Sequence, residues 1–356
     1  MTNPITLTYL SSFDEIIDVR TPDEFALDHV PGAQNFPVLS NLERAQIGTL
    51  YKQTSEFEAK KLGAALIARN ISEHLQQHFT NRPKTWRPLV YCWRGGMRSG
   101  AMQHILRQIG WRAEKIPGGY KAYRHAVFTD LETLPTHFDF KVICGLTGSG
   151  KSRLLTALAK QGAQVLDLEQ LAQHRGSLLG NLPDCPQPAQ KMFDSRVWWQ
   201  LSRFNPAQPV FVEAESKKIG NLRVPESLIL SMWQPGRCLR LQTEDALRVT
   251  LLKQEYAHFL AQPEKLLHQL NFLLDLYGHT QIDTWAANIL SGEWDELVLS
   301  LLQQHYDRSY EQSMRLHYPD YADSPSVPLR ALDEATLREL AVKILDRGDQ
   351  PEPCTD

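Results

Sequence analysis

Short apolar runs alternate with longer stretches of helical character along the first third of the chain. Residues 16–19 and 89–92 have the length and composition of buried strands. Between them, Ser55 and Glu58 have the spacing of a capping box, which predicts a helix that begins there and continues to about residue 79. Short strands interleaved with helices are typical of a parallel α/β sheet.

The same alternation resumes after a proline-containing seam at residues 133–136. Further strands are expected at residues 142–144, 164–166, 209–212 and 238–241. From residue 243 to about residue 345, apolar positions recur at helical spacing, which predicts a largely helical C-terminal part. The expected segments are a parallel-sheet domain at residues 1–135, a second α/β domain with a helical extension at residues 136–345, and a tail at residues 346–356.

Length and composition are those of an ordinary soluble globular protein. The 356 residues are too many for one typical core, and 42% hydrophobic with 22% charged residues is a common balance. A net charge of −3 excludes a generally basic surface, so any contact with nucleic acid has to be a local basic patch. The five cysteines are scattered and odd in number, which argues for a reducing compartment rather than a disulfide framework. Neither a signal peptide nor a membrane-length apolar segment is visible, so we expect a cytoplasmic protein without a membrane partner.

The first glycine-containing loop carries a cysteine. It reads Cys92-Trp93-Arg94-Gly95-Gly96-Met97-Arg98-Ser99 and follows the apolar run at residues 88–91. A cysteine between a buried strand and a helix faces several backbone N–H groups, which lower the pKa of its thiol and form a nest for a tetrahedral anion. We predict a reactive thiolate at Cys92, with Arg98 closing the anion site, over the alternative of an inert core cysteine. Further donors to the anion are expected from Arg94, Gly95, Gly96 and Ser99.

The loop and the segments around it resemble the rhodanese family. Recognisable stretches of that family are found at residues 17–25, 29–33, 35–37 and 118–120. The resemblance implies a rhodanese-like sheet in which Asp18, Arg20 and His29 serve structure rather than catalysis. The Cys-x5-Arg spacing is one residue wider than in common sulfurtransferase loops and is shared with dual-specificity phosphatases of rhodanese ancestry. The loop alone therefore leaves chalcogen transfer and dephosphorylation open.

The second glycine-rich loop, at residues 145–152, follows the strand at residues 142–144 and precedes a helix. Gly-x4-Gly-Lys-Ser in this context is the P-loop signature, whose backbone N–H groups approach phosphate oxygens. Lys151 is expected to reach the terminal phosphates, and Ser152 is a candidate magnesium ligand. The predicted diphosphate site consists of Gly145, Gly148, Gly150, Lys151 and Ser152. The motif does not decide between a nucleotide and another diphosphate.

Charged residues follow two later strands. Asp167 and Glu169 come after residues 164–166, and Glu213 and Glu215 come after residues 209–212. One of these acids is expected to organise magnesium or a water molecule; a solvated carboxylate at a strand end is the alternative, and the sequence does not establish a resident metal. Basic residues near these acids are candidates for contacts with RNA or a diphosphate, and ordinary surface charge is the alternative for each of them. They are His174, Arg175, Lys217, Lys218 and Arg223.

A rhodanese domain joined to a C-terminal P-loop domain resembles the bacterial tRNA 2-selenouridine synthase family, over roughly residues 5–335. Beyond the two loops, supporting stretches are residues 48–53, 167–169, 174–177 and 215–220, and Gly63. The resemblance implies an α/β protein with an N-terminal rhodanese-like parallel-sheet domain. A P-loop NTPase-like α/β domain with a helical C-terminal part is expected to follow.

The resemblance also implies an activity. Members replace sulfur by selenium in wobble 2-thiouridine of the tRNAs for Lys, Glu and Gln, with selenophosphate as donor, through an S-geranyl-2-thiouridine made from geranyl diphosphate. In this scheme the Cys92 thiolate attacks selenium and becomes an S-selanylcysteine as phosphate departs, while Arg98 stabilises the phosphate charge. The Lys151 loop holds geranyl diphosphate, and Gly63 matches a glycine linked to geranylation. A transient contact with the selenophosphate-producing enzyme is expected as well. Trp198 and Trp199 are candidates for sheltering the prenyl chain or for stacking on an unpaired anticodon base, although core packing is the simpler role for both.

Two other functions remain open. One is a rhodanese-type sulfurtransferase or Cys-x5-Arg phosphatase coupled to an ATP-dependent P-loop domain. The other is a nucleotide-sensing scaffold, which the activated thiol at Cys92 disfavours.

Overall fold

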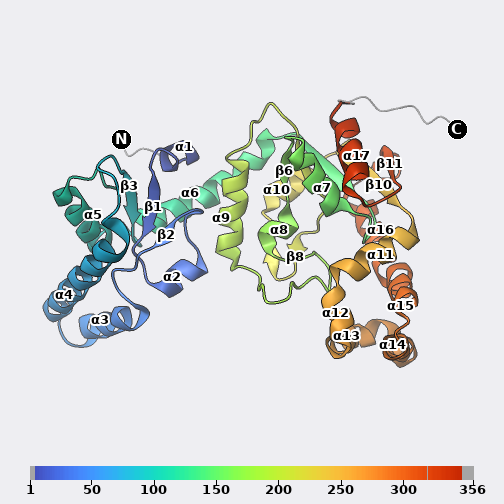
Figure 1. Cartoon of the computed structure of the whole chain (residues 1–356), viewed down its shortest axis with the longest axis horizontal. Coiled ribbons are helices and arrows are strands. Elements are labelled where there is room, and N and C mark those ends of the chain that lie inside the picture. Colours follow the sequence, from blue (N-terminus) through green and yellow to red (C-terminus); the bar gives the residue numbers. More distant parts are fainter. Residues whose placement is uncertain (1–4, 319, 347–356) are drawn as a thin grey trace. The chain divides into compact units, whose positions relative to one another are not determined.

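The computed structural model describes residues 5–318 and 320–346 of the chain, and Figure 1 shows its elements. They form two compact units. The first contains the residues up to Leu134 together with Pro188–Arg203, and the second contains Pro135–Gln187 and the residues from Phe204 onward. Each unit is built around one parallel sheet, so the expected α/β fold class is confirmed. Of the expected tail, residues 347–356 lie outside the described residues.

A four-stranded parallel sheet in the order β2-β1-β3-β4 forms the centre of the first unit. β1 and β3 pair with Ile17 opposite Val90, and both strands are buried along their whole length, as is usual for parallel strands covered on both faces. The strands are β1 (Glu15–Asp18), β2 (Gln34–Asn35), β3 (Pro88–Tyr91) and β4 (Glu114–Lys115). The helices are α1 (Leu7–Leu10), α2 (Pro22–Leu27), α3 (Asn41–Gln53), α4 (Glu56–His74), the π-helix η1 (Leu75–Phe79), α5 (Met97–Ile109), α6 (Gly119–Thr133) and α9 (Gln190–Leu201).

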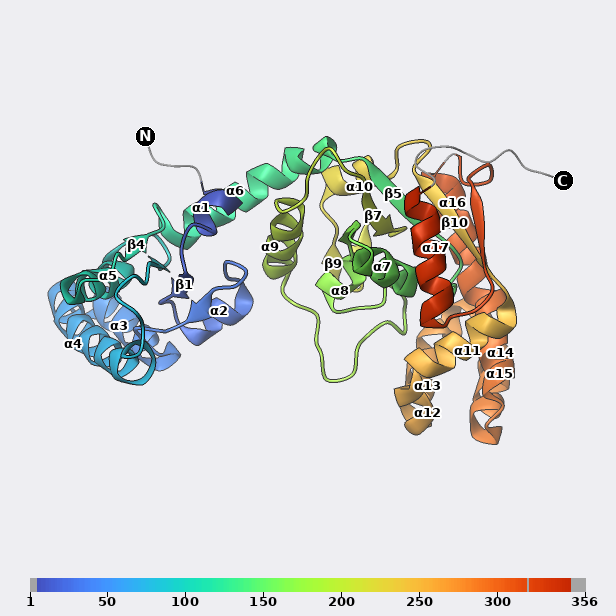
Figure 2. The same cartoon turned by 45° about the horizontal axis from the view of Figure 1, so that its top comes forward.

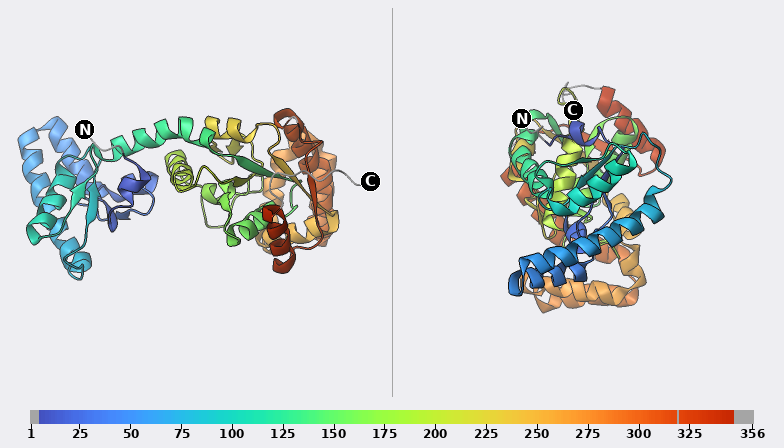
Figure 3. Two further views of the ribbon diagram at one scale, coloured as in Figure 1. Left: turned by 90° about the horizontal axis from the view of Figure 1, so that it is seen from above. Right: turned by 90° about the vertical axis from the view of Figure 1, so that its left-hand side faces the viewer.

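The predicted helix start at Ser55 is confirmed. Ser55 is the N-cap of α4, and its hydroxyl accepts a hydrogen bond from the N–H of Glu58 (3.3 Å). Figure 2 and the left view of Figure 3 show α3 and α4 lying side by side. Gly63 lies at their contact, where a Cβ would come 3.5 Å from Cδ1 of Ile47. Its observed surroundings are therefore those of helix packing, and its link to geranylation stays a prediction.

A five-stranded parallel sheet in the order β11-β10-β5-β7-β6 forms the centre of the second unit. Its strands are β5 (Phe140–Cys144), β6 (Gln164–Leu166), β7 (Val210–Glu213), β10 (Cys238–Thr243) and β11 (Ser326–Leu329), and β8 (Lys218–Ile219) with β9 (Leu222–Arg223) forms a separate antiparallel pair. The helices beside the strands are the 3₁₀ turn η2 (Leu134–His137), α7 (Lys151–Lys160), α8 (Leu168–Ala172), α10 (Glu226–Met232) and α17 (Glu334–Asp346), which packs beside α7 (Figure 2). The predicted helical part contains α11 (Asp245–Glu255), α12 (Ala257–Ala261), α13 (Pro263–Leu270), the 3₁₀ turn η3 (Asn271–Leu273), α14 (Leu274–Ser291), α15 (Trp294–Leu301), the π-helix η4 (Leu302–Tyr306) and α16 (Asp307–His317).

Two elements differ from expectation. β11 interrupts the region predicted as helical, and it contains Pro328, which lacks a backbone N–H. The strand lies at the edge of the sheet, where a missing donor is tolerated. Helix α9, expected in the second domain, belongs to the first unit because it packs on α6. Trp198 of α9 is 1% exposed and donates from Nε1 to Asp130 (2.7 Å), so core packing is its observed role.

Candidate active site

The Cys92 loop is shaped by close backbone contacts. Gly119 has φ +62°, and a Cβ there would lie 2.3 Å from the carbonyl oxygen of Cys92 and 2.4 Å from the nitrogen of Gly95. The N–H of Tyr120 donates to the Cys92 carbonyl (2.9 Å). Gly95 itself has φ +68°. Glycine is therefore required at Gly119 and favoured at Gly95, and the rhodanese-like segment at residues 118–120 holds the loop in place.

The sulfur of Cys92 is buried among polar groups. The residue is 3% exposed, and its Sγ lies 3.2 Å from Oγ of Ser99, the third residue of α5. Burial by itself raises the pKa of the thiol, but hydrogen bonding from the hydroxyl and N–H of Ser99 acts against it. The charge of Arg98 and the N–H of Arg94 act in the same direction. Together they lower the pKa of Cys92 below its ordinary value, which favours the thiolate.

The predicted donors around Cys92 contribute in different ways. Ser99 is buried and reaches the sulfur through its side chain. The side chain of Arg94 is exposed, so its observed contribution is its backbone N–H. Gly96 precedes α5 as its N-cap. Lys115, which the sequence analysis does not single out, donates to the carbonyl of Gly95 (3.3 Å) and brings another positive charge to the loop.

Replacing Ser99 with Ala is expected to raise the pKa of Cys92, because the hydroxyl that stabilises the thiolate is lost. Alkylation of Cys92 by iodoacetamide at pH 7 should slow by about threefold or more, and its pH profile should move to higher pH. Peptide mass spectrometry across pH 5–9 measures both. Ser72→Ala, at an exposed hydroxyl on α4, is the matched control. An unchanged profile for Ser99→Ala would contradict the assignment.

Asp18, Arg20 and His29 have structural environments. Arg20 is buried and donates to the Asp18 carboxylate from Nε (3.0 Å to each oxygen) and from Nη2 (2.6 Å to Oδ2). Its Nη2 also donates to the carbonyl of Asp28 (2.6 Å). The ring of His29 stacks on Phe25. These contacts bind the segment after β1 together and agree with the expected structural role.

The P-loop joins β5 to α7 as predicted. Gly148 and Gly150 have φ of +76° and +90°, and a Cβ on Gly148 would lie 2.9 Å from Cγ of Leu252. Lys151 is the first residue of α7, and its Nζ donates to the carbonyl of Gly145 (2.7 Å). Backbone donors at a glycine-rich turn before a helix, with a lysine ammonium over them, form an anion site.

Acidic residues gather at Ser152, the second residue of α7. Its Oγ lies 3.5 Å from Oε2 of Glu169 and 3.5 Å from Oε2 of Glu213, which is 1% exposed. Burial, followed by the charge of Glu215, raises the pKa of Glu169 to about 8. Burial also raises the pKa of Glu213, and the charge of Glu169 adds to it. Asp167 caps α8 by accepting from the N–H of Gln170 (2.8 Å), and burial raises its pKa.

These acids lie together around Ser152, and they are too close to ionise independently. Among the described residues, no three His, Cys, Asp or Glu side chains are arranged to hold a metal ion. Ser152, the second residue of α7, stays a candidate magnesium ligand.

Stability should depend on pH through Glu169. Its pKa is about 8 in the folded protein and ordinary in the unfolded chain, so the folded state holds this proton more tightly. Its favourable contribution to the free energy of unfolding is therefore complete below about pH 4.5 and is lost as the pH rises through 8. Glu169→Gln is therefore expected to raise the Tm at pH 9 by roughly 2 °C or more, with a smaller change at pH 6. Differential scanning calorimetry measures it, with exposed Glu132→Gln as control. Equal shifts at both pH values would rule out this origin.

Two family models match the chain. The rhodanese-like domain matches residues 8–126, and the tRNA 2-selenouridine synthase AAA domain matches residues 138–271. A tRNA 2-selenouridine synthase of Alcanivorax borkumensis is 36% identical over 342 residues, covering 86% of this chain and 92% of that protein. The corresponding protein of Shewanella piezotolerans is 30% identical, covering 85% and 89%. That of Nitrosomonas europaea is 39% identical over 216 residues, covering 60% and 56%.

The chain belongs to the tRNA 2-selenouridine synthase family. The expected family is thereby confirmed, together with its rhodanese-like and P-loop domains. Among residues 5–318 and 320–346, no helix is long and apolar enough to cross a membrane.

Sequence reasoning missed a carboxylate partner in the thiol site. Nη1 of Arg98 donates to Oε2 of Glu24 on α2 (2.8 Å). Burial raises the pKa of Glu24, but the ion pair with Arg98 outweighs this and holds it below its ordinary value. Glu24 therefore fixes the guanidinium, and an incoming anion has to share Arg98 with it. The local signal at Glu24 is that of a helix cap, because it forms a capping box with Thr21.

Two residues that clamp the P-loop were also missed. Arg248 of α11 is 1% exposed, donates from Nε to the carbonyl of Thr147 (2.9 Å) and forms an ion pair with Asp307. The N–H of Gly145 donates to the hydroxyl of Tyr310 on α16 (2.7 Å). The helical part of the family's P-loop domain therefore holds the loop from outside the motif, a contact that only the tertiary structure reveals.

Arg175, a candidate for diphosphate contact, has an unusual environment. Its guanidinium lies 4.8 Å from the ring centre of Tyr256 on the segment between α11 and α12. Its Nη1 is buried without a hydrogen-bond partner among the described residues. A buried guanidinium nitrogen with no partner is costly unless an anion binds there.

A groove beside Trp93 combines aromatic and basic side chains. Phe128 is 60% exposed, Trp93 is 39% exposed, and the ring of Trp93 lies 5.2 Å from that of Tyr120. The groove is lined by Trp93, Tyr120, Lys121, Arg124, His125, Phe128 and Lys191. Trp93 follows Cys92 directly, so this surface adjoins the thiol loop within the first unit.

Proposed function

We propose that this member of the tRNA 2-selenouridine synthase family is a tRNA-modifying enzyme that exchanges sulfur for selenium in wobble 2-thiouridine. The proposed substrates are the anticodon loops of the tRNAs for Lys, Glu and Gln, and selenophosphate is the proposed donor. The observation that carries the proposal is the Cys92 thiol, whose pKa is lowered inside an anion nest. Relatives that match most of the chain are named tRNA 2-selenouridine synthase, which supports the tRNA substrate.

Cys92 is the proposed nucleophile for selenophosphate, and the electron balance limits its product. Attack on selenium forms the S–Se bond of an S-selanylcysteine and leaves the Se–P electron pair on phosphorus as phosphite. Release of phosphate in that step, as expected from the sequence, would require a two-electron acceptor such as a disulfide. Attack on phosphorus instead forms an S-phosphocysteine and frees selenide, and water then releases phosphate. Arg98 and the loop N–H groups stabilise the phosphoryl charge in both cases.

The P-loop is the proposed site for geranyl diphosphate. The sulfur of 2-thiouridine forms a bond to the first carbon of the geranyl group as its C–O bond breaks, and the diphosphate leaves. Lys151 and the loop N–H groups are placed to stabilise the negative charge of that leaving group. Magnesium bound to Ser152 and the diphosphate would add positive charge there. Selenide freed by attack on phosphorus then bonds to C2 of the base as the C–S bond breaks and geranylthiol leaves. Transfer from an S-selanylcysteine would in addition need a thiol reductant to cleave the S–Se bond.

The groove beside Trp93 is the proposed docking surface for the RNA. Exposed aromatic rings stack on unpaired bases, and nearby lysine and arginine side chains attract the phosphate backbone. Its basic side chains supply the local patch that the net charge of −3 requires.

Replacing Phe128 with Ala should weaken tRNA binding by roughly tenfold, because stacking on one ring is lost. Fluorescence anisotropy with labelled tRNA at fixed salt measures the affinity. Leu27→Ala, at an exposed apolar residue of α2, is the control. The rate of Cys92 alkylation without tRNA should be unchanged in both variants, and an unchanged tRNA affinity would remove Phe128 from the docking surface.

Nucleoside mass spectrometry tests the proposed activity as a whole. The full chain is incubated with 2-thiouridine-containing tRNA, geranyl diphosphate and selenophosphate, and then with each small substrate omitted. We expect S-geranyl-2-thiouridine without selenophosphate and 2-selenouridine when both are present. Absence of 2-selenouridine, with hydrolysis of aryl phosphates instead, would favour the phosphatase alternative.

A further inference from the structure

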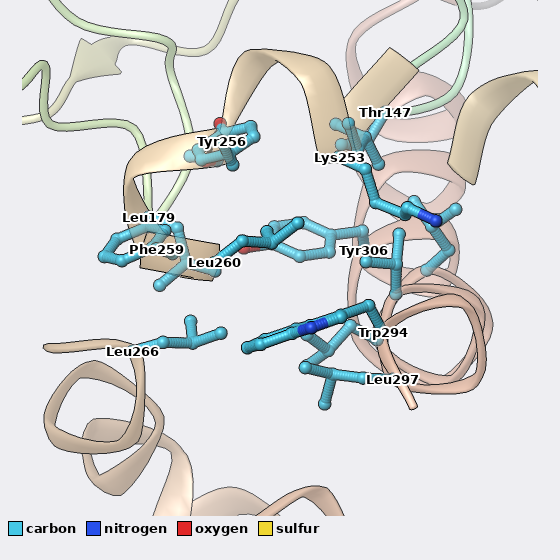
Figure 4. A pocket seen from close by; sticks show the side chains of 15 residues that line it. Thr147, Leu179, Lys253, Tyr256, Phe259, Leu260, Leu266, Trp294, Leu297 and Tyr306 are labelled. Atoms are coloured by element: carbon cyan, nitrogen blue, oxygen red, sulfur yellow. Dashed lines mark hydrogen bonds between the residues drawn. The ribbon is translucent and has the colours of Figure 1, made fainter. Parts of the chain in front are cut away.

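An apolar cavity lies beside the P-loop within the second unit (Figure 4). Its walls come from α11, α12, α13, α15 and η4, and Thr147 of the P-loop is one of its lining residues. In Figure 4, Thr147 and Lys253 lie at one side, and Leu266, Trp294 and Leu297 lie across the cavity from them. The empty space between these walls is ≈ 560 Å³, a figure that includes volume open to solvent.

The walls are mainly hydrocarbon. Phe259, Leu266 and Leu297 are each less than 9% exposed, and the rings of Tyr256 and Phe259 stack 6.1 Å apart. Two of the polar groups among the lining residues have partners within the protein. The hydroxyl of Tyr256 lies 3.5 Å from that of Ser177, and Nζ of Lys253 forms an ion pair with Asp295. A nucleobase would find few donors or acceptors here, whereas a hydrocarbon chain needs none.

The cavity borders the P-loop. Leu252 lines the cavity and also packs against the P-loop, where a Cβ on Gly148 would come 2.9 Å from its Cγ. The guanidinium of Arg175 lies 4.8 Å from the ring centre of Tyr256. Nη1 of that guanidinium is buried without a hydrogen-bond partner among the described residues. A molecule bound by the P-loop therefore lies next to an apolar wall, and a guanidinium nitrogen without a hydrogen-bond partner among the described residues lies beside that wall.

We propose that this cavity holds the hydrocarbon chain of a prenyl diphosphate whose diphosphate is bound by the Lys151 loop, and that Arg175 binds the diphosphate as well. The proposal rests on the proposed function of the P-loop and adds what selects its ligand. The P-loop binds the diphosphate group of any such ligand alike, so the hydrocarbon part of the ligand determines which diphosphate is selected. The prenyl chain is assigned to these walls rather than to Trp198 and Trp199, because Trp198 lies in the core of the first unit.

Chain length is the first variable to test. Each buried methylene contributes about fourfold in affinity, so geranyl diphosphate should bind at least ~100-fold tighter than the five-carbon dimethylallyl diphosphate. Inorganic diphosphate and GDP should bind more weakly than geranyl diphosphate. Isothermal titration calorimetry of the full chain, without tRNA, gives these affinities. Equal binding of all diphosphates, or tighter binding of GDP, would overturn the proposal.

Variants separate the two halves of the site. Leu260→Trp fills the cavity from α12 and should lower the preference for geranyl over dimethylallyl diphosphate by about tenfold, with inorganic diphosphate unaffected. Arg175→Ala should weaken all the diphosphates by similar factors. Leu276→Trp, at a residue 71% exposed on α14, is the matched control.

The outcomes also separate this inference from the proposed function. Chain-dependent binding without any geranylated nucleoside would support the cavity assignment and overturn the geranyl-transfer step. Geranylated nucleoside formed with equal affinity for short and long chains, or with an unchanged preference in Leu260→Trp, would support the step and overturn the cavity assignment.

Discussion

Replacing Cys92 with Ser is expected to abolish selenium incorporation, with a loss of roughly three orders of magnitude or more. The exchange keeps the size of a side chain that is 3% exposed, but it replaces a thiol of lowered pKa with a hydroxyl that does not ionise near neutral pH. 2-Selenouridine is measured by nucleoside mass spectrometry of tRNA that already carries S-geranyl-2-thiouridine. Supplying this tRNA removes any dependence on the P-loop.

Cys185→Ser is the matched control, because Cys185 is a free cysteine of the second unit without an assigned role. It should retain full activity. The Cys92→Ser protein should still form S-geranyl-2-thiouridine from geranyl diphosphate. Selenium incorporation by Cys92→Ser at the unmodified rate would rule out the thiol as the nucleophile.

Replacing Lys151 with Ala is expected to lower the rate of geranyl transfer by about 10²- to 10³-fold. The ammonium group lies over the P-loop, 2.7 Å from the carbonyl oxygen of Gly145, where it would neutralise the charge of the leaving diphosphate. Initial rates of S-geranyl-2-thiouridine formation at saturating geranyl diphosphate measure the effect. Selenium incorporation into pre-geranylated tRNA should be unchanged.

Lys160→Ala provides the control on the same helix. Lys160 is the last residue of α7, is exposed, and pairs with Glu334 on α17 (2.6 Å). Losing an exposed ion pair should cost little stability and no activity. Equal rates for Lys151→Ala and Lys160→Ala would remove the diphosphate role of the P-loop lysine.

Both anion loops are predictable from the sequence because their signals are local. Cys92 directly follows an apolar strand, and Lys151 begins the helix after another. In each loop, glycines between the strand and the helix form the turn. The same local reasoning predicts the start of α4 at Ser55 and places Asp167, Glu169 and Glu213 at the ends of two strands that prove to be neighbours.

The partners of these loops come from distant segments and leave no local signal. Glu24 reaches Arg98 across 74 positions, and Arg248 reaches Thr147 across 101 positions. The sequence places helix α9 in the second domain, because the segments before and after it belong to that domain. Its side chains nevertheless pack on α6 of the first unit. The apolar cavity could not be predicted from the sequence for the same reason. Its lining residues come from separate helices, and in the sequence each of them looks like an ordinary core position.

Cys92 is the proposed nucleophile for selenophosphate. The direct measurement is peptide mass spectrometry of the full chain after a single addition of selenophosphate, without tRNA, together with ³¹P NMR of the released product. We expect a covalent adduct on the Cys92 peptide alone. It is either a selenium adduct with its isotope pattern and phosphite as co-product, or a phosphoryl adduct with selenide released. An unmodified Cys92 peptide from protein that still forms 2-selenouridine would contradict it.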